Sequence, residues 1–229
     1  MKLLVIDTST DYCSAALWLG GQTRARRVRA GQQHSSLLLP MVDALLRESG
    51  CSLRQLDGIA YGAGPGSFTG LRIACAVTQG LAFGADLPVV GISTLESIAQ
   101  QMDAARVMTV LDARMAEVYW AAYQREPNGW RCVVAPALAR PESVSVPAGE
   151  DWVGAGNGLA ALGEVLRPQL VTRLVRIDDT LVPDAGAMAP LAAAAFERGE
   201  ATDAALAAPI YLRDKVALTV DERRARQTA

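Results

Sequence analysis

Histidine is almost absent from this sequence of 229 residues, in which His34 is the only one. Many zinc sites use imidazole ligands and the Ser-His-Asp triad requires one, so the chain is poorly supplied for either kind of chemistry. A single histidine in front of a predicted helix is more often a capping or packing residue than a ligand. We therefore expect neither a metal site nor a hydrolase triad.

Paired cysteines and an uninterrupted apolar run are also missing. The four cysteines have no C-x-x-C spacing. The longest apolar region, residues 71–92, contains an arginine, a glutamine, an aspartate and a proline, so it does not predict a membrane span. The opening MKLLVIDTST meets an aspartate after a short apolar run and predicts no signal peptide. We expect a cytoplasmic protein with reduced thiols and no membrane association.

A strong net charge is the third missing feature. The formal charge is −2, which gives no global attraction to nucleic acid, so contact with RNA is expected only within a complex. What the chain does have is apolar content: 51% of its residues are hydrophobic and 20% are charged. That composition and length predict a globular protein with one large or two small domains.

Hydrophobic periodicity predicts a meander followed by alternating helices and strands in the first half of the chain. The predicted strands are residues 2–7, 12–19, 22–28, 57–61 and 88–92, and the predicted helices are residues 36–46, 67–83 and 94–102. Ser35 or Ser36 is predicted to cap the first helix, and Pro40 predicts that this helix either starts or bends there. Strands that alternate with helices are usually buried on both faces.

The second half repeats the first. LLVIDTSTDYCSAALWLGG aligns with MTVLDARMAEVYWAAYQRE, which matches Asp7 with Asp112 at the ends of the two first strands. A strand at 152–155, a helix at 157–166, a strand at 173–177 and a helix at 183–198 follow. We predict a first lobe at residues 1–103, a second, smaller lobe at 104–210 and a charged tail at 211–229 that packs on or near the first lobe.

Two βββαβα halves whose first strands end in aspartate resemble the superfamily of actin, sugar kinases and chaperone ATPases. The predicted fold class is therefore α/β, with a duplicated, two-lobed actin-like ATPase (ribonuclease H-like) fold. In that superfamily a nucleotide lies between the lobes, and an autonomous ATPase or kinase that uses Asp7 and Asp112 is one hypothesis.

The two strand-end turns argue against that hypothesis. DTSTD and DARMAE lack the glycine that lets a backbone approach a phosphate, so the site is expected to be degraded. An Asx-type turn is the structural alternative at Asp7. The positions of such a vestigial nucleotide site would be Asp7, Thr8, Ser9, Asp112 and Gly156.

The stretch GAGPGSFTGLR, residues 62–72, imitates a phosphate loop. It has no lysine for a P-loop, a serine where a dinucleotide fingerprint has its third glycine, and the wrong spacing for a nucleophile elbow. We predict a tight turn from strand to helix with Ser67 as the N-cap. Ser67 and Thr69 remain candidates for contact with a ligand near an interface.

The helix after this turn carries small residues every fourth position, at Ala76, Gly80 and Gly84. Each glycine lowers helix propensity by roughly 1 kcal/mol, and close packing against another helix is the natural compensation. The preceding helix is apolar on more than one face. Either both helices are covered by the rest of the chain, or they form an interface with a second protein of similar shape.

These residues resemble the TsaB (YeaZ) family. The likeness rests on MKLLVIDTST, HSSLLLPMVDALL, DARMAEVYWA, PIYLRD and above all YGAGPGSFTGLRIACAVTQGLAFGADLPVVGISTLES, and it extends over nearly the whole chain. The family has glycine where this chain has Ala74. The resemblance implies a bacterial, non-catalytic subunit that binds a larger paralogue, TsaD.

With the ATPase TsaE, that complex transfers a threonylcarbamoyl group to the adenosine next to the anticodon of tRNAs that read codons beginning with A. The paralogue holds its metal through H-x-x-x-H, of which this chain has His34 and then Leu38, so catalysis is not carried over. Association through helices of the first half is implied, as is a homodimer when the paralogue is absent. No resident cofactor is expected, although a weak or interfacial nucleotide remains open. The interface candidates are Leu38, Val42, Leu45, Leu71, Ala76 and Gly80.

Overall fold

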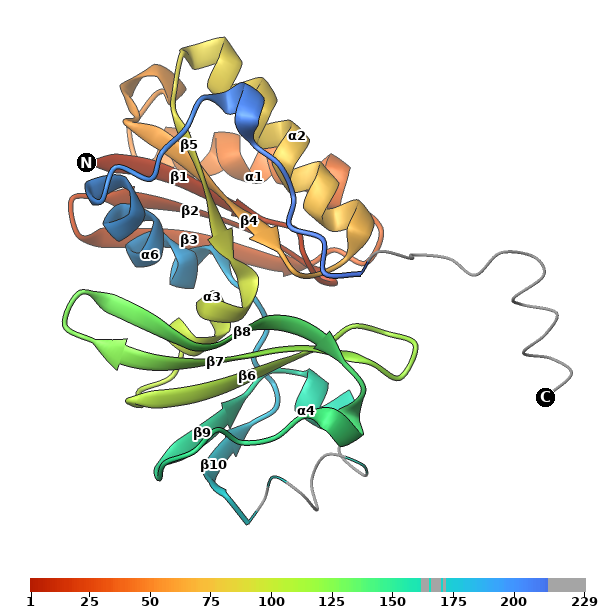
Figure 1. Cartoon of the computed structure of the whole chain (residues 1–229). Coiled ribbons are helices and arrows are strands. Elements are labelled where there is room, and N and C mark those ends of the chain that lie inside the picture. The colour runs from red at the N-terminus through yellow and green to blue at the C-terminus, as the bar shows by residue number, and fades with distance from the viewer. Residues whose placement is uncertain (162–164, 166–169, 171, 214–229) are drawn as a thin grey trace, which may run out of the picture.

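Two five-stranded sheets, one in each half of the chain, form the two lobes of the molecule (Figure 1). The structure is a computed structural model that describes residues 1–161, 165, 170 and 172–213. The first sheet contains β1 (Lys2–Asp7), β2 (Tyr12–Leu19), β3 (Gln22–Arg29), β4 (Gly58–Gly64) and β5 (Val89–Ser93). The second contains β6 (Arg106–Asp112), β7 (Val118–Glu126), β8 (Gly129–Ala139), β9 (Trp152–Ala155) and β10 (Leu174–Asp178).

The two sheets have the same topology. Their strand orders are β3-β2-β1-β4-β5 and β8-β7-β6-β9-β10. In each, the first three strands form an antiparallel meander and the last two run parallel to the first. The predicted duplication is confirmed, with Asp7 and Asp112 closing the two equivalent strands β1 and β6.

The helices α1 (His34–Glu48) and α2 (Phe68–Ala85) cover one face of the first sheet. Successive side chains of a strand point to opposite faces, and β1 is apolar on both. Leu4 and Ile6 pack in the same cluster as α1 and α2, whereas Leu3 and Val5 pack in the cluster that contains α6 (Ala185–Glu197). The first sheet is therefore buried on both sides, as its continuous apolar strands predict.

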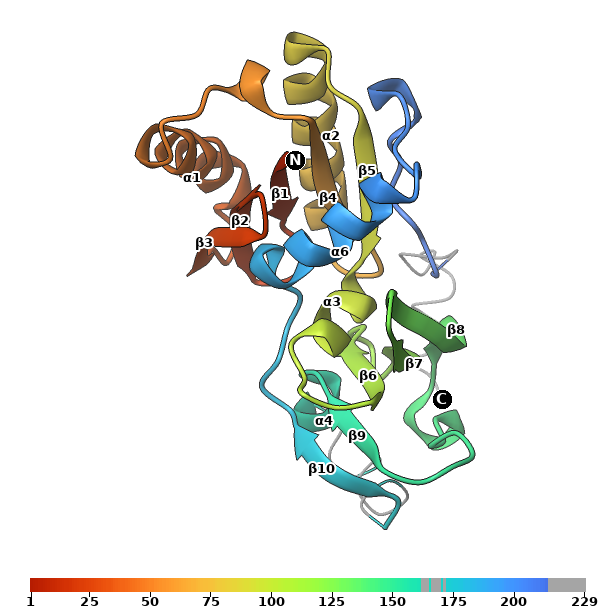
Figure 2. The ribbon, with the colours of Figure 1, turned by 90° about the vertical axis from the view of Figure 1, so that its left-hand side faces the viewer.

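Two helices cross between the lobes. The helix α6 belongs to the second half of the sequence but packs on β1 and β2, and α3 (Thr94–Gln100) belongs to the first half but packs on β6 and β7. Figure 2 shows both helices between the sheets. This exchange corrects the predicted ranges 1–103 and 104–210, because residues 94–100 and 185–197 contribute to the cores of the opposite lobes.

The remaining described elements are short: α4 (Gly158–Ala161), η1 (Leu53–Gln55), η2 (Pro141–Ser143) and η3 (Ala204–Leu206). Part of the predicted helix at 157–166, and the tail from 214 onward, lie outside the described residues. The predicted serine cap of α1 is wrong: Gln33 precedes the helix without a side-chain cap bond, and the Ser36 hydroxyl donates to the Gln33 carbonyl at 2.9 Å. Within the described ranges, no helix has the length and apolar character needed to cross a bilayer.

Candidate functional site

The glycine-rich loop between β4 and α2 packs against the turn that follows β1. A Cβ atom at Gly62 would overlap the Asp7 carboxyl, and one at Gly70 would overlap the Thr8 carbonyl oxygen. At Gly66 it would lie 2.6 Å from the Ser9 carbonyl oxygen, far inside van der Waals contact. The glycines therefore allow two backbone segments to approach each other closely.

Hydrogen bonds fix this loop to the turn. The backbone N–H of Ser67 donates to the Ser9 carbonyl at 2.7 Å, and the Thr8 hydroxyl donates to the Gly70 carbonyl at 2.6 Å. Ser67 is the N-cap of α2, as predicted, and its hydroxyl accepts the Gly70 N–H. The backbone N–H groups of Ser67 and Gly70, which a phosphate loop could offer to an anion, thus bind protein oxygens instead.

The carboxyl of Asp7 points into the protein rather than into the cleft. The side chain is fully buried, one oxygen accepts bonds from the Ser9 N–H at 3.3 Å and the Ser9 hydroxyl at 3.0 Å, and the other oxygen has no partner within the described residues. Burial raises the pKa of Asp7 to about 7, against the lowering effect of the Ser9 bonds. A group in this position cannot hold magnesium in the cleft.

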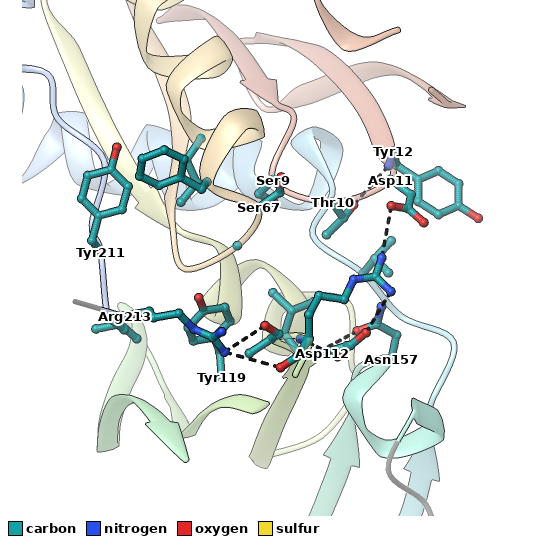
Figure 3. Close-up of a pocket in the computed structure, with 18 of the residues that line it drawn as sticks. Ser9, Thr10, Asp11, Tyr12, Ser67, Asp112, Tyr119, Asn157, Tyr211 and Arg213 are labelled. Atoms are coloured by element: carbon teal, nitrogen blue, oxygen red, sulfur yellow. Dashed lines mark hydrogen bonds and ion pairs between the residues drawn. The ribbon is translucent and has the colours of Figure 1, made fainter. Parts of the chain in front are cut away.

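A cavity of about 540 Å³ lies between the lobes where β1 and β6 end (Figure 3). The first lobe contributes the turn after β1 and the start of α2, and the second lobe contributes the turn after β6 together with Asn157. Residues 210–213 close one side. The lining is mixed in character: Asp11, Asp112, Arg29, Arg114 and Arg213 are charged, and Tyr12, Phe68, Tyr119 and Tyr211 are aromatic.

Arg114 spans this cavity. Its guanidinium lies 3.4 Å from the carboxylate of Asp112 in its own lobe and 3.5 Å from that of Asp11 in the first lobe. Figure 3 shows Asp11 and Asp112 on opposite sides of the cleft. The backbone N–H of Asp112 is taken by the side-chain oxygen of Asn157 at 3.1 Å. The carboxylate equivalent to Asp7 is thus neutralised by an arginine.

The structure separates the predicted vestigial positions into two groups. Ser9 and Asp112 line the cavity, as does the ligand candidate Ser67. The side chains of Asp7 and Thr8 are fully buried away from it, and Gly156 packs against the Val110 carbonyl of β6. Thr69 is exposed but does not line the cavity. Asp7, Thr8 and Gly156 therefore cannot contact a ligand in this cleft, and the prediction is corrected for these three residues.

The predicted interface residues also divide. Four of them, Leu38, Val42, Leu45 and Leu71, are at most 3% exposed and belong to the interior of the first lobe. They are core residues because α1 and α2 turn these faces toward the sheet, which corrects their assignment to a partner surface. Ala76 and Gly80 are exposed, and no described residue beyond the adjoining helix backbone lies within 4 Å of a Cβ placed at Gly80 or Gly84.

The outer face of α2 also carries a large apolar side chain that is not among the predicted interface residues. Phe83 is 62% exposed, and it follows Ala76 and Gly80 at helical spacing. We define the α2 outer stripe as Ala76, Gly80, Phe83 and Gly84. Leu39, 48% exposed, lies on the outer side of α1. These exposed residues differ from their neighbours only because the opposite face of each helix is buried against the protein. Hydrophobic periodicity does not show which face is covered, so the sequence alone could not identify them.

The sequence of the chain matches a family model described as "TsaD: tRNA N6-adenosine threonylcarbamoyltransferase" over residues 28–219. The "tRNA threonylcarbamoyladenosine biosynthesis protein TsaB" of Escherichia coli (strain K12) is 41% identical over 95% of this chain and 96% of its own length. The chain belongs to the TsaB (YeaZ) family. The TsaB of Haemophilus influenzae is 36% identical over 94% of this chain and 95% of its own.

Among solved structures, YeaZ from Pseudomonas aeruginosa matches with a TM-score of 0.86 and 42% identity, covering 92% of this chain and 99% of the other. With the two equivalent sheets, this match confirms the predicted two-lobed actin-like ATPase fold of the TsaB family member. The resemblance inferred from the glycine-rich loop is likewise confirmed.

The single histidine of this TsaB-family chain has a structural contact. His34 opens α1, is buried, and its Nε2 lies 2.8 Å from the Thr10 carbonyl oxygen. Among the residues that the structure describes, no three His, Cys, Asp or Glu side chains gather as a metal centre would require.

Two arginines of the cleft were not singled out from the sequence. Arg114 and Arg213 lie in the stretches DARMAEVYWA and PIYLRD, which carry part of the family resemblance. Their proximity depends on the return of the chain to the cleft after α6, which no local pattern predicts. The available signal was that both arginines fall outside helices and strands, in stretches that carry the family resemblance.

Proposed function

We propose that this chain is a non-catalytic subunit in the biosynthesis of tRNA threonylcarbamoyladenosine, the process named in the descriptions of its relatives from Escherichia coli and Haemophilus influenzae. In this proposal it binds a larger, TsaD-like paralogue that carries the catalytic site, and a TsaE-like ATPase and the tRNA join through the complex. The α2 outer stripe is the observation that carries the proposal. Two helices can approach closely where one presents glycine and alanine, and Phe83 supplies an apolar anchor beside them.

The non-catalytic assignment is supported by the state of the candidate catalytic groups. Asp7 is buried against Ser9, Asp112 is paired with Arg114, and His34 contacts a backbone carbonyl. Each of these groups is engaged within the chain, so none is free to act as a general base or a metal ligand. In this proposal the role of the chain is to bind the paralogue and support the reaction at the paralogue's catalytic site. It does so as a soluble subunit in the cytoplasm.

Gly80→Leu tests the partner surface. The added side chain has open space on the isolated chain but would occupy the closest point of approach of a second helix. We expect the affinity for the paralogue, measured by calorimetry, to fall at least about tenfold, which is 1.4 kcal/mol. Ala160→Leu, at an exposed helical position of the second lobe, is the matched control and should bind normally. An unchanged affinity in Gly80→Leu would contradict the assignment of the interface.

Reconstitution of the tRNA modification tests the function itself. Purified paralogue, ATPase and tRNA should form threonylcarbamoyladenosine when this chain is present and little or none when it is omitted. Gly80→Leu should lower the yield in parallel with the loss of heterodimer, and excess variant should recover part of it. A full yield without this chain would contradict the proposed role.

Self-association is expected when the paralogue is absent, because an α2 outer stripe that binds a paralogue of similar fold can also bind a second copy of this chain. Sedimentation velocity should show a concentration-dependent dimer for the native chain and a monomer for Gly80→Leu. A dimer that persists in this variant would place the self-contact elsewhere.

Nucleotide binding in the cleft is the second candidate function, since a cavity of about 540 Å³ is large enough for a small ligand. We propose that the isolated chain holds no nucleotide tightly, because Asp7 does not reach the cavity and Arg114 occupies Asp112. Calorimetry with ATP and magnesium should give no binding in the micromolar range. Micromolar binding that is lost in Asp112→Asn would favour the autonomous ATPase or kinase instead.

A further inference from the structure

After α6 the chain returns along the first lobe, and residues 210–213 reach the cleft. We define the C-terminal strap as residues 207–213. The Ala207 carbonyl accepts from the Cys75 thiol at 3.3 Å and from the Gln79 side chain at 3.2 Å, and the Tyr61 hydroxyl bonds both the N–H and the carbonyl of Ala208. The Ile210 N–H donates to the Ala63 carbonyl at 2.7 Å. The beginning of the strap is therefore fixed to β4 and α2.

The end of the strap is fixed to the other lobe. Arg213 donates to the Glu117 carboxylate at 2.7 Å, to the Ala113 carbonyl at 3.1 Å and to the Arg114 carbonyl at 3.4 Å. Its second terminal nitrogen lies 2.8 Å from the sulfur of Met115. The Arg213 side chain is only 12% exposed. One largely buried guanidinium thus binds four of the five residues from 113 to 117.

The turn that Arg213 binds has an unfavourable backbone. Arg114, Met115 and Ala116 have φ values of 61°, 57° and 58°, three successive non-glycine residues in the left-handed region. L-residues are disfavoured there because Cβ crowds the following carbonyl oxygen. Such a turn persists only where its surroundings determine it, and Arg213 supplies contacts that do so.

This turn also positions the residue that spans the cleft. Arg114 reaches Asp11 of the first lobe, and Asp11 also lies 4.0 Å from Arg29. These side chains are exposed, with Arg114 at 73%, so their ion pairs contribute little to stability. The hydrogen bonds of Arg213 are largely buried, so they connect the strap to the second lobe more strongly than the exposed ion pair of Arg114 and Asp11 connects the two lobes.

We propose that the C-terminal strap is a tether that holds the two lobes at a fixed separation, with Arg213 as the positioning residue for the left-handed turn at 113–117. In this proposal the width of the cleft is controlled by the C-terminal strap in addition to the two interlobe crossings at α3 and α6. The proposal concerns the isolated chain and does not depend on the proposed function.

Hydrogen exchange of the full-length protein tests the effect on the turn. The N–H groups of Ala113, Arg114 and Glu117 are hydrogen-bonded within the turn, and in Arg213→Ala their exchange should accelerate about tenfold or more. Arg131→Ala removes a comparable arginine, bound to Glu126 and Gln124, from the same sheet and should leave the turn unchanged. Unchanged exchange in a folded Arg213→Ala would overturn the proposal. If this variant does not fold, Arg213→Lys replaces it, with the same expectation.

A distance measurement tests the tether. Spin labels on Cys132, which is exposed in the second lobe, and on Asp43→Cys of α1, in a Cys51→Ser background, report the separation of the lobes. We expect one narrow distance distribution for the native strap and a broader one for Arg213→Ala. A distribution that stays narrow in Arg213→Ala would overturn the tether.

The double variant Arg213→Ala with Ala116→Gly separates the two roles of Arg213. Glycine adopts the left-handed region without the Cβ penalty, so the turn should regain part of its protection from exchange. The distance distribution should stay broad, because the connection between strap and second lobe is still absent. Recovery of the narrow distribution by glycine alone would show that the turn, not the strap, holds the lobes.

Discussion

At the scale of single residues, Asp7 is the most perturbed group of the site. Its pKa is raised from 3.8 to about 7 because burial penalises the charged form, and the nearby Asp184 adds to the rise. Between these two values the folded protein holds a proton that the unfolded chain releases. The free energy of unfolding therefore falls as the pH rises from about 4 to 7, and above 7 the folded state carries the full penalty of a buried charge.

Asp7→Asn should remove this dependence. We expect the variant to be more stable than the native protein at pH 8, by roughly 4 kcal/mol at most, and to show a flatter profile between pH 4 and 7. Urea unfolding at a series of pH values measures both effects.

Glu96→Gln is the matched control for Asp7→Asn. Burial raises the pKa of Glu96 to about 6, so its contribution to the same fall lies in the narrower window from 4.5 to 6. An Asp7→Asn profile that follows the native one would show that this carboxyl ionises freely in the folded state.

At the scale of elements, α2 separates two uses of glycine along one helix. Gly70 packs against the turn after β1, where an added Cβ would overlap the Thr8 carbonyl oxygen. Gly80 and Gly84, further along, face open space. The first glycine serves packing within the lobe, and the other two serve the outer stripe.

Matched alanine substitutions distinguish these uses. Gly70→Ala should lower the free energy of unfolding by roughly 1–3 kcal/mol, since the backbone must shift to admit the methyl group. Gly80→Ala should raise it by roughly 0.5–1 kcal/mol, because alanine favours the helix and meets nothing. Chemical denaturation of the two variants measures the difference. Equal effects of the same sign would contradict the packing described for α2.

At the scale of the whole molecule, the exchange of α3 and α6 makes the lobes interdependent. The face of the first sheet that contains Leu3 and Val5 is covered by Met188, Leu191 and other apolar residues of α6. A chain that ends before α6 would expose this face, and apolar area of that kind is the main source of folding free energy.

A fragment of residues 1–104 is therefore expected to lack a cooperative thermal transition and to bind an apolar dye. Co-expression with residues 105–229 should restore a folded complex, because the second fragment supplies α6. Circular dichroism during heating is the measurement. A cooperative transition of the first fragment alone would show that α6 is dispensable for the first lobe.

Local patterns were sufficient for the strands and for the duplication. The strands predicted at residues 2–7 and 12–19 and the alignment of Asp7 with Asp112 depend on short local stretches, and the structure confirms them. The N-cap Ser67 was predictable for the same reason, since capping is a contact between residues three apart.

The site required long-range information. Leu38 and Leu71 were placed on a partner surface because periodicity gives an apolar face but not the element that covers it. Asp7 was a candidate for the cleft because a strand-end position does not specify whether its carboxyl points outward or beneath Gly62. Both errors concern orientation relative to segments distant in the sequence.

The sequence by itself determined the two-lobed fold, the shortage of metal ligands and the family, because these depend on composition, periodicity and motifs. Only the tertiary structure decided which residues remain exposed on α2, that the glycine-rich loop packs on the turn after β1, and that Arg213 joins the C-terminal strap to the second lobe. The physical reason is that burial and hydrogen bonding depend on which segments meet in space. Segments that are distant in the sequence meet here because the chain returns to the first lobe after α6.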